Sequence, residues 1–94
     1  MKMLHIVMGT TGEYSDRSEW PVVAYHDETL AMEHVRLATR RAKEIFAVYD
    51  RQNYGVELPK NEYDADMQMQ YTGTDYFIYV VPVARSLPKI AAAD

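Results

Sequence analysis

The sequence contains no cysteine, and this absence excludes several kinds of chemistry at once. A chain without cysteine has no disulfide framework, no thiolate nucleophile and no thiolate zinc site. A domain of 94 residues buries only about 60 to 65 % of its unfolded surface, so its stability must come from an apolar core or a second subunit. We expect one domain over residues 1–83 and a C-terminal tail at 84–94.

Long apolar runs are also missing. The N-terminal run, Met3–Met8, is far shorter than the roughly 20 residues of a membrane-spanning helix, and no signal cleavage site follows it. The net charge is −4, which weakly repels nucleic acid and anionic membranes. The sequence therefore predicts a cytoplasmic protein that binds no membrane, and its charge argues against nucleic-acid binding.

Catalytic and ligand-binding motifs are scarce. The stretch Gly9–Gly12 opens no helix, so it lacks the phosphate-binding geometry of a glycine-rich loop. Neither Ser15 nor Ser18 lies in a G-x-S-x-G elbow, and the three histidines form no metal-ligand pair. We assign no catalytic residue, metal ligand or cofactor, and a non-enzymatic role is favoured.

The alternating acids Glu62, Asp64 and Asp66 are the best candidates for a cation site. Carboxylate oxygens at this spacing could chelate Mg²⁺ or Ca²⁺. They lack the glycine and the further carboxylates of a calcium loop, so a solvated acidic connection is the favoured interpretation.

Four segments have the pattern of strands. Met3–Met8 and Tyr76–Val81 are apolar on both alternating faces, which indicates central strands. Met67–Tyr71 alternates with period two, and Trp20–Tyr25 carries Pro21 near its start, which favours an edge position.

One long helix is predicted between the second and third of these segments. Asp27 is the expected N-cap, and the helix should run from about Glu28 to about Tyr49. At 100° per residue, one broad apolar stripe gathers Ala31, Val35, Ala38, Ala42, Ile45, Phe46 and Tyr49. The predicted fold is α+β in the order ββαββ, with the helix packed on one face of a four-stranded, largely antiparallel sheet.

This architecture leaves one sheet face without cover. Because the first and last strands are apolar on both sides, a second copy of the chain is the simplest partner for that face. We therefore predict a homodimer with a twofold interface. The alternative is that the C-terminal tail folds back and covers the face through Leu87 and Ile90.

The polar loop Thr10–Glu19 ends at Trp20, and its part from Glu13 to Trp20 is the main candidate for binding a protein partner, because loops on a rigid scaffold carry recognition groups. Aromatic and arginine side chains are typical anchors of protein interfaces. The candidate partner-binding residues are Glu13, Tyr14, Asp16, Arg17 and Trp20. In the alternative interpretation Trp20 is buried beneath the loop and Tyr14 only covers the hairpin end.

His34 and Arg41 fall inside the apolar arc of the helix and form a second candidate site. Together they could bind a ligand, with Arg41 holding a carboxylate or phosphate. In the favoured alternative Arg41 reaches the rim through its stem, and His34 donates a hydrogen bond to a strand-end carbonyl.

Two other functions are less favoured. The exposed helix side carries Arg36, Arg40, Lys43 and Arg51, but interspersed acids and the negative net charge argue against nucleic-acid binding. An enzyme acting on a small ligand or using a metal would depend on the acids of the connection and a histidine.

The segment from Thr11 to Trp20, the Asp27-Glu28 helix start and the Tyr71–Thr74 turn before the closing strand carry a resemblance. Together they resemble small uncharacterised proteins encoded by bacteriophages and prophages. This resemblance covers nearly the whole chain except the tail and implies an accessory protein in the cytoplasm of a bacterial host, with a host protein as a candidate partner. It implies no active site.

Overall fold

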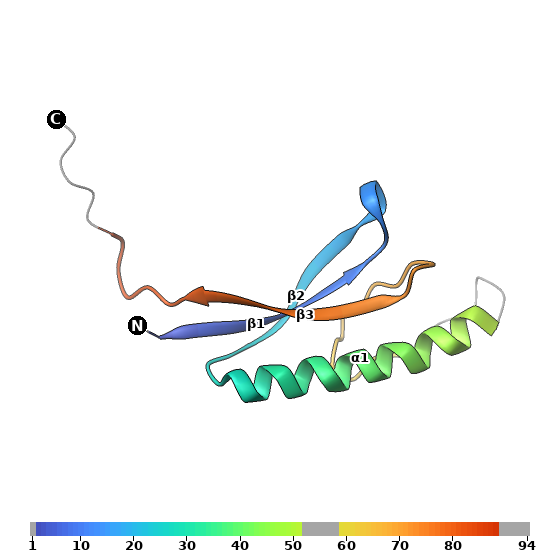
Figure 1. The fold of residues 1–94 in the computed structure, drawn as a ribbon, viewed down its shortest axis with the longest axis horizontal. Helices are drawn as coiled ribbons and strands as arrows, with labels where there is room; N and C mark the ends of the chain where they lie inside the picture. Colours follow the sequence, from blue (N-terminus) through green and yellow to red (C-terminus); the bar gives the residue numbers. More distant parts are fainter. Residues whose placement is uncertain (1, 52–58, 89–94) are drawn as a thin grey trace.

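The computed structural model describes residues 2–51 and 59–88. The elements are β1 (Met3–Thr11), a short 3-10 turn η1 (Tyr14–Asp16), β2 (Ser18–Tyr25), α1 (Glu28–Arg51) and β3 (Thr74–Pro82). The strands form an antiparallel sheet in the order β2-β1-β3, and α1 runs along one face of it (Figure 1). This confirms the predicted α+β class with one long helix.

The two faces of the sheet follow from the register of the strands. Val7 lies opposite Val23 on one side and Ile78 on the other, and Val7 is fully buried under the helix. Residues directly opposite one another in an antiparallel pair share a face, and neighbours along a strand alternate between faces. The odd-numbered residues of β1 from His5 to Thr11 therefore face α1, and its even-numbered residues face away.

β2 is an edge strand, as Pro21 predicts, and β1 is central, but β3 forms the other edge, so the prediction that Tyr76–Val81 is a central strand is wrong. The register between β1 and β2 shifts at Val7 and Met8, so β2 carries an extra residue as a bulge. Proline removes one backbone N–H from the ladder, which an edge strand tolerates.

The helix begins where the sequence predicts. Asp27 caps it through a 2.8 Å bond from the Thr29 backbone N–H to its Oδ1. The most deeply buried positions form the predicted stripe and include Ala31, Ala38, Ala42 and Ile45. The expected stop signals at residues 53–55 lie outside the described residues.

The predicted strand at Met67–Tyr71 is wrong, and the order of the elements is ββαβ. These residues instead form part of a connection, residues 59–73, whose backbone is partly satisfied by side chains. The Gln70 N–H donates to Thr11 Oγ1 at 2.9 Å, and Thr74 Oγ1 donates to the Gln68 carbonyl. The apolar positions Met67 and Met69 pack against the core, so their alternation reflects burial without strand pairing.

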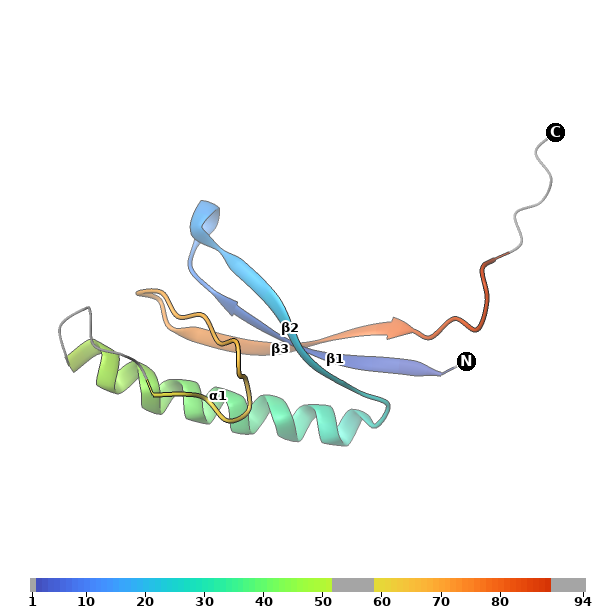
Figure 2. The ribbon, with the colours of Figure 1, turned by 180° about the vertical axis from the view of Figure 1, so that it is seen from behind.

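The connection and α1 together form the second layer. Both lie on the same side of the sheet, with the connection toward β2 (Figure 2). No described residue covers the opposite face, on which Figure 1 shows only the hairpin tip and residues 83–88 rising at its two ends. The alternative prediction was that the C-terminal tail covers that face through Leu87 and Ile90. Leu87 is 90 % exposed, and Ile90 lies outside the described residues.

Candidate functional site

The tip of the β1–β2 hairpin, residues 12–19, contains most of the predicted partner-binding residues. Gly12 begins the turn with a φ of 88°, and a Cβ there would lie 2.4 Å from the Asp16 carbonyl oxygen, so only glycine fits. Tyr14 has a φ of 52° and is 93 % exposed. A tyrosine in the left-handed region costs about 1 to 2 kcal/mol, and its exposed ring gains no burial in return.

Hydrogen bonds hold this tip in one conformation. Within the turn, the Asp16 N–H donates to the Glu13 carbonyl at 2.9 Å and the Arg17 N–H donates to the Tyr14 carbonyl at 3.1 Å. From the connection, Gln70 Nε2 donates to the Asp16 carbonyl at 2.8 Å. The tip is therefore attached to the scaffold beside it as well as to its own strands.

The connection makes further bonds at the base of the tip. Thr72 Oγ1 accepts a 2.9 Å bond from the Gly12 N–H, and Ser18 Oγ lies 2.9 Å from Gln68 Oε1. Thr11 Oγ1 donates to the Gly73 carbonyl at 2.6 Å. These contacts join residues about 50 to 60 positions apart in sequence, and they orient the tip relative to the sheet.

Charged side chains surround the tip. Arg17 forms an exposed ion pair with Glu19, with 2.7 Å between Nη2 and Oε2. An exposed pair of this kind contributes at most about 1 kcal/mol, so Arg17 can change partners at little cost. A hollow of about 390 Å³ lies at the base of the tip, and its charged walls are Glu13, Arg17 and Asp75. Glu13, Tyr14, Asp16 and Arg17 are all exposed and available to a partner.

Trp20, the fifth predicted residue, belongs to the interior. It is only 7 % exposed, and its ring lies so close to Gly9 that a Cβ there would be 2.5 Å from a ring carbon. Its Nε1 donates a 2.9 Å hydrogen bond to Asp64 Oδ2. Trp20 is therefore buried, as the alternative interpretation expects, but it lies between Gly9 and the connection, and it does not belong to the partner-binding surface.

Asp64 is the central residue of a buried polar network that the sequence interpretation missed. Its Oδ2 also accepts a 2.7 Å bond from the Tyr76 hydroxyl, and Asn61 Nδ2 lies 3.4 Å from that hydroxyl. Burial raises the pKa of Tyr76 well above its ordinary value, and the hydrogen bond to Asp64 raises it further. The network fixes the connection beneath the sheet, so it supports the tip indirectly.

The three acids of the connection do not form a cation site. Asp64 is buried and its Oδ2 is occupied by two donors, whereas Glu62 and Asp66 are exposed. Among residues 2–51 and 59–88, no group of three or more histidine or acidic side chains is arranged to hold a metal ion.

His34 and Arg41 both reach the connection but do not form one site. His34 Nδ1 lies 2.8 Å from the Tyr25 hydroxyl, and Nε2 lies 2.7 Å from the Tyr63 carbonyl oxygen. Because a carbonyl only accepts, Nε2 carries the proton of this bond. Both ring nitrogens of His34 are therefore occupied, which leaves none for a ligand.

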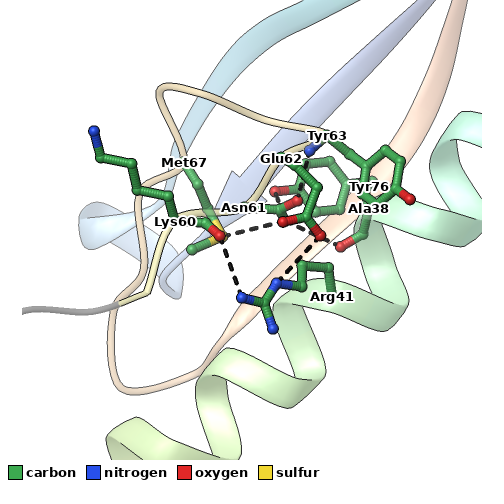
Figure 3. A network of polar contacts seen from close by, with 8 residues as sticks. All are labelled: Ala38, Arg41, Lys60, Asn61, Glu62, Tyr63, Met67 and Tyr76. Atoms are coloured by element: carbon green, nitrogen blue, oxygen red, sulfur yellow. Dashed lines mark hydrogen bonds and ion pairs between the residues drawn. The ribbon is translucent and has the colours of Figure 1, made fainter.

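Arg41 lies beside the beginning of the connection (Figure 3). Its Nη2 donates a long 3.4 Å bond to the Lys60 carbonyl, and its Nε lies 3.4 Å from Glu62 Oε1 without forming a hydrogen bond. A hollow of about 170 Å³ touches Arg41 and Tyr63 but not His34. The structure thus places the two residues of the predicted ligand pair in separate environments.

The basic side of α1 is partly neutralised. Arg36 Nε donates to Glu33 Oε2 at 3.0 Å, and a second contact joins Nη2 to Glu33 Oε1. This side-chain hydrogen bond lowers the pKa of Glu33 and raises the pKa of Arg36. Arg40 and Lys43 are exposed nearby, and the side chain of Arg51, the fourth residue of the predicted basic side, is not among those that the structure describes.

No known family model matches the chain, and no curated protein or solved structure matches it either. In the part of the chain that the structure describes, no helix has the length and apolar character needed to cross a membrane.

Proposed function

We propose that this chain is a non-enzymatic protein-interaction module that presents the hairpin tip, residues 12–19, to a protein partner. The setting we propose is that of a phage-type accessory protein in the cytoplasm of a bacterial host, with a host protein as the partner. We further propose that the module is a homodimer, so that each assembly carries two tips.

Tyr14 is the observation that carries this proposal. A large aromatic side chain is 93 % exposed at the end of a hairpin, in a backbone conformation that glycine or asparagine would adopt at lower cost. Strain that brings no burial suggests a role outside the monomer, and a rigid exposed tyrosine beside an arginine is typical of an interface anchor. Exposed Glu13, Asp16 and Arg17 supply a polar rim around the ring.

The tip differs from an ordinary surface loop because it is held in place. Its hydrogen bonds with Gln70, which donates, and Thr72, which accepts, remove conformational freedom before a partner arrives. A preorganised loop loses less entropy on binding than a mobile one, which favours affinity from a small contact area.

Affinity capture from host lysate, followed by binding measurements with the purified partner, tests the proposal. Tyr14→Ala and Arg17→Ala should each weaken partner binding at least tenfold while the melting temperature stays within about 2 °C of wild type. Tyr14→Gly should stabilise the protein by about 0.5 to 1 kcal/mol because it relieves the left-handed strain, and it should still lose the partner.

The matched control is Tyr71→Ala, which removes a tyrosine that is 58 % exposed and lies outside the tip. This variant should bind the partner as wild type does. Retention of the partner by both the Tyr14 and the Arg17 variants would refute the role of the tip.

A further inference from the structure

The sheet face opposite α1 presents a continuous apolar surface, which we call the free face. Its central rows are three cross-strand pairs between β1 and β3: Leu4 with Val81, Ile6 with Tyr79, and Met8 with Phe77. β2 adds Ala24 beside Ile6 and Pro21 beside Met8. All of these side chains are at least partly exposed, and Tyr79 in the middle row is 58 % exposed.

The two ends of the free face carry opposite charges. At one end Asp75 and Glu19 lie on either side of Thr10. At the other end Lys2 lies opposite Val83, and both line a hollow together with Arg85. Lys2 directly precedes β1 and lies eight residues before Thr10, which separates the two ends by about 27 Å if the chain is extended throughout.

Some of these charged side chains already have an ion-pair partner and others do not. Glu19 already pairs with Arg17, so the unpaired negative charge at its end comes from Asp75 and from Glu13, which lines the same hollow. Asp75, Lys2 and Arg85 have no ion pair with any other residue in the described ranges. An apolar surface with one acidic and one basic end is complementary to itself when it is turned end for end.

We propose that the free face binds the free face of a second copy of this chain, about a twofold axis that lies in the plane of the face and runs perpendicular to the strands. This inference rests on the homodimer proposed above and specifies its interface. The axis passes through the row of Ile6 and Tyr79, so Tyr79 lies near its own counterpart. The acidic end of each subunit then meets the basic end of the other, with Asp75 facing the region of Arg85.

Charge distinguishes this arrangement from the other twofold packing of the same faces. An axis parallel to the strands and along β1 would place Asp75 near the partner subunit's Glu19 and Lys2 near the partner subunit's Lys2, and like charges at close range oppose association. An isologous interface requires a self-complementary patch, and only the perpendicular axis makes both the apolar rows and the charges complementary. The result is a four-layer assembly with the two sheets inside and the two helices outside.

The free edge of β3 offers a competing way to form a dimer. The Val83 N–H donates to the Lys2 carbonyl, so alternate residues of β3 bond β1, and the Val80 N–H points to the open edge. Pairing of β3 with β3 of a second copy would use that group. Val80→Pro removes it and should leave the face-to-face dimer intact, because an edge strand tolerates proline.

Two variants matched in exposure provide the first test, in which the mass in solution is measured by light scattering and sedimentation over a range of protein concentrations. Tyr79→Arg places a charge at the centre of the free face and should raise the dimer dissociation constant at least 100-fold. Tyr71→Arg replaces a tyrosine that is also 58 % exposed but lies outside the free face, and it should leave the constant within about threefold of wild type.

A charge exchange then tests the orientation. Asp75→Lys and Arg85→Glu should each raise the dissociation constant about five- to tenfold, because each creates two like-charge contacts across the twofold axis. The double variant restores opposite charges at both contacts and should return to within about threefold of wild type. Additive loss in the double variant would overturn the end-for-end arrangement.

Other outcomes separate this inference from the role of the hairpin tip. A wild-type protein that is monomeric at about 100 µM, or a dimer lost in Val80→Pro but kept in Tyr79→Arg, would overturn the face-to-face interface. Partner binding by the Tyr14 tip is measured separately on the monomeric Tyr79→Arg variant. Failure of one measurement therefore leaves the other interpretable.

Discussion

Asp64 joins three parts of the chain through one carboxylate oxygen. Trp20 from β2 and Tyr76 from β3 both donate to its Oδ2, and Asp64 itself belongs to the connection. Each donor is buried, so each would lose a partner without gaining water if the carboxylate were removed. The network is therefore a stability determinant that lies directly under the strand leading from the hairpin tip.

Replacing Asp64 with alanine should lower the free energy of unfolding by about 2 to 4 kcal/mol, because two buried donors are left unsatisfied. Urea unfolding followed by circular dichroism measures this loss, and the fluorescence of Trp20 should shift to longer wavelength as its surroundings become wetter. The control is Asp66→Ala, an exposed acid two residues further on, which should change stability by no more than about 0.5 kcal/mol. Equal effects of the two substitutions would contradict the central role of Asp64.

The sequence could not reveal this network, because its members are far apart in the chain and no local pattern links them. Asp64 and Trp20 are separated by 44 positions, and an acid in a polar connection resembles any solvated acid. The hydrogen bonding of His34 was easier to predict, because a polar residue inside an apolar arc needs a hydrogen-bonding partner in almost any fold. The predicted partner type, a backbone carbonyl, is confirmed, but the carbonyl belongs to Tyr63 in the connection and not to a strand end.

At the scale of elements, periodicity predicted the helix well and the third predicted strand badly. The stripe of α1 repeats over many turns, so a single misplaced residue hardly changes its direction. The segment Met67–Tyr71 offers only a few alternations, and burial of Met67 and Met69 against the core produces the same pattern without strand pairing. A short alternation marks which side chains are buried. It does not show what the backbone bonds to, which here is the side chain of distant Thr11 and that of nearby Thr74.

The helix stripe gives a prediction at this scale. Ile45 is fully buried, so Ile45→Ala should lower the free energy of unfolding by about 2 to 4 kcal/mol through lost burial and a cavity. Leu30 is 53 % exposed on the same helix, and Leu30→Ala should cost less than about 1 kcal/mol. Thermal or urea unfolding of both variants measures the difference, and similar losses would mean that α1 packs through another face.

For the whole molecule, the important feature is that two layers leave one side of the sheet open. α1 and the connection cover one face, and the rows from Leu4 to Met8 and from Phe77 to Val81 form the other. Contiguous apolar patches of this kind usually mark an interaction site. The sequence predicted a homodimer from this imbalance, and the register adds the charged ends that favour one orientation of the second copy.

Coupling between folding and association gives a final prediction. While the protein concentration stays well above the dimer dissociation constant, unfolding also separates the subunits, so a higher protein concentration favours the folded dimer by mass action. For a chain of 94 residues, each tenfold increase in concentration should then raise the melting temperature by about 3 to 5 °C. Calorimetry or circular dichroism between about 2 and 200 µM measures this slope.

Tyr79→Arg should melt at a temperature independent of concentration, because it prevents the free faces from meeting. A wild-type melting temperature that does not change with concentration, together with a monomeric mass, would show that the free face is stable in water and would contradict the homodimer.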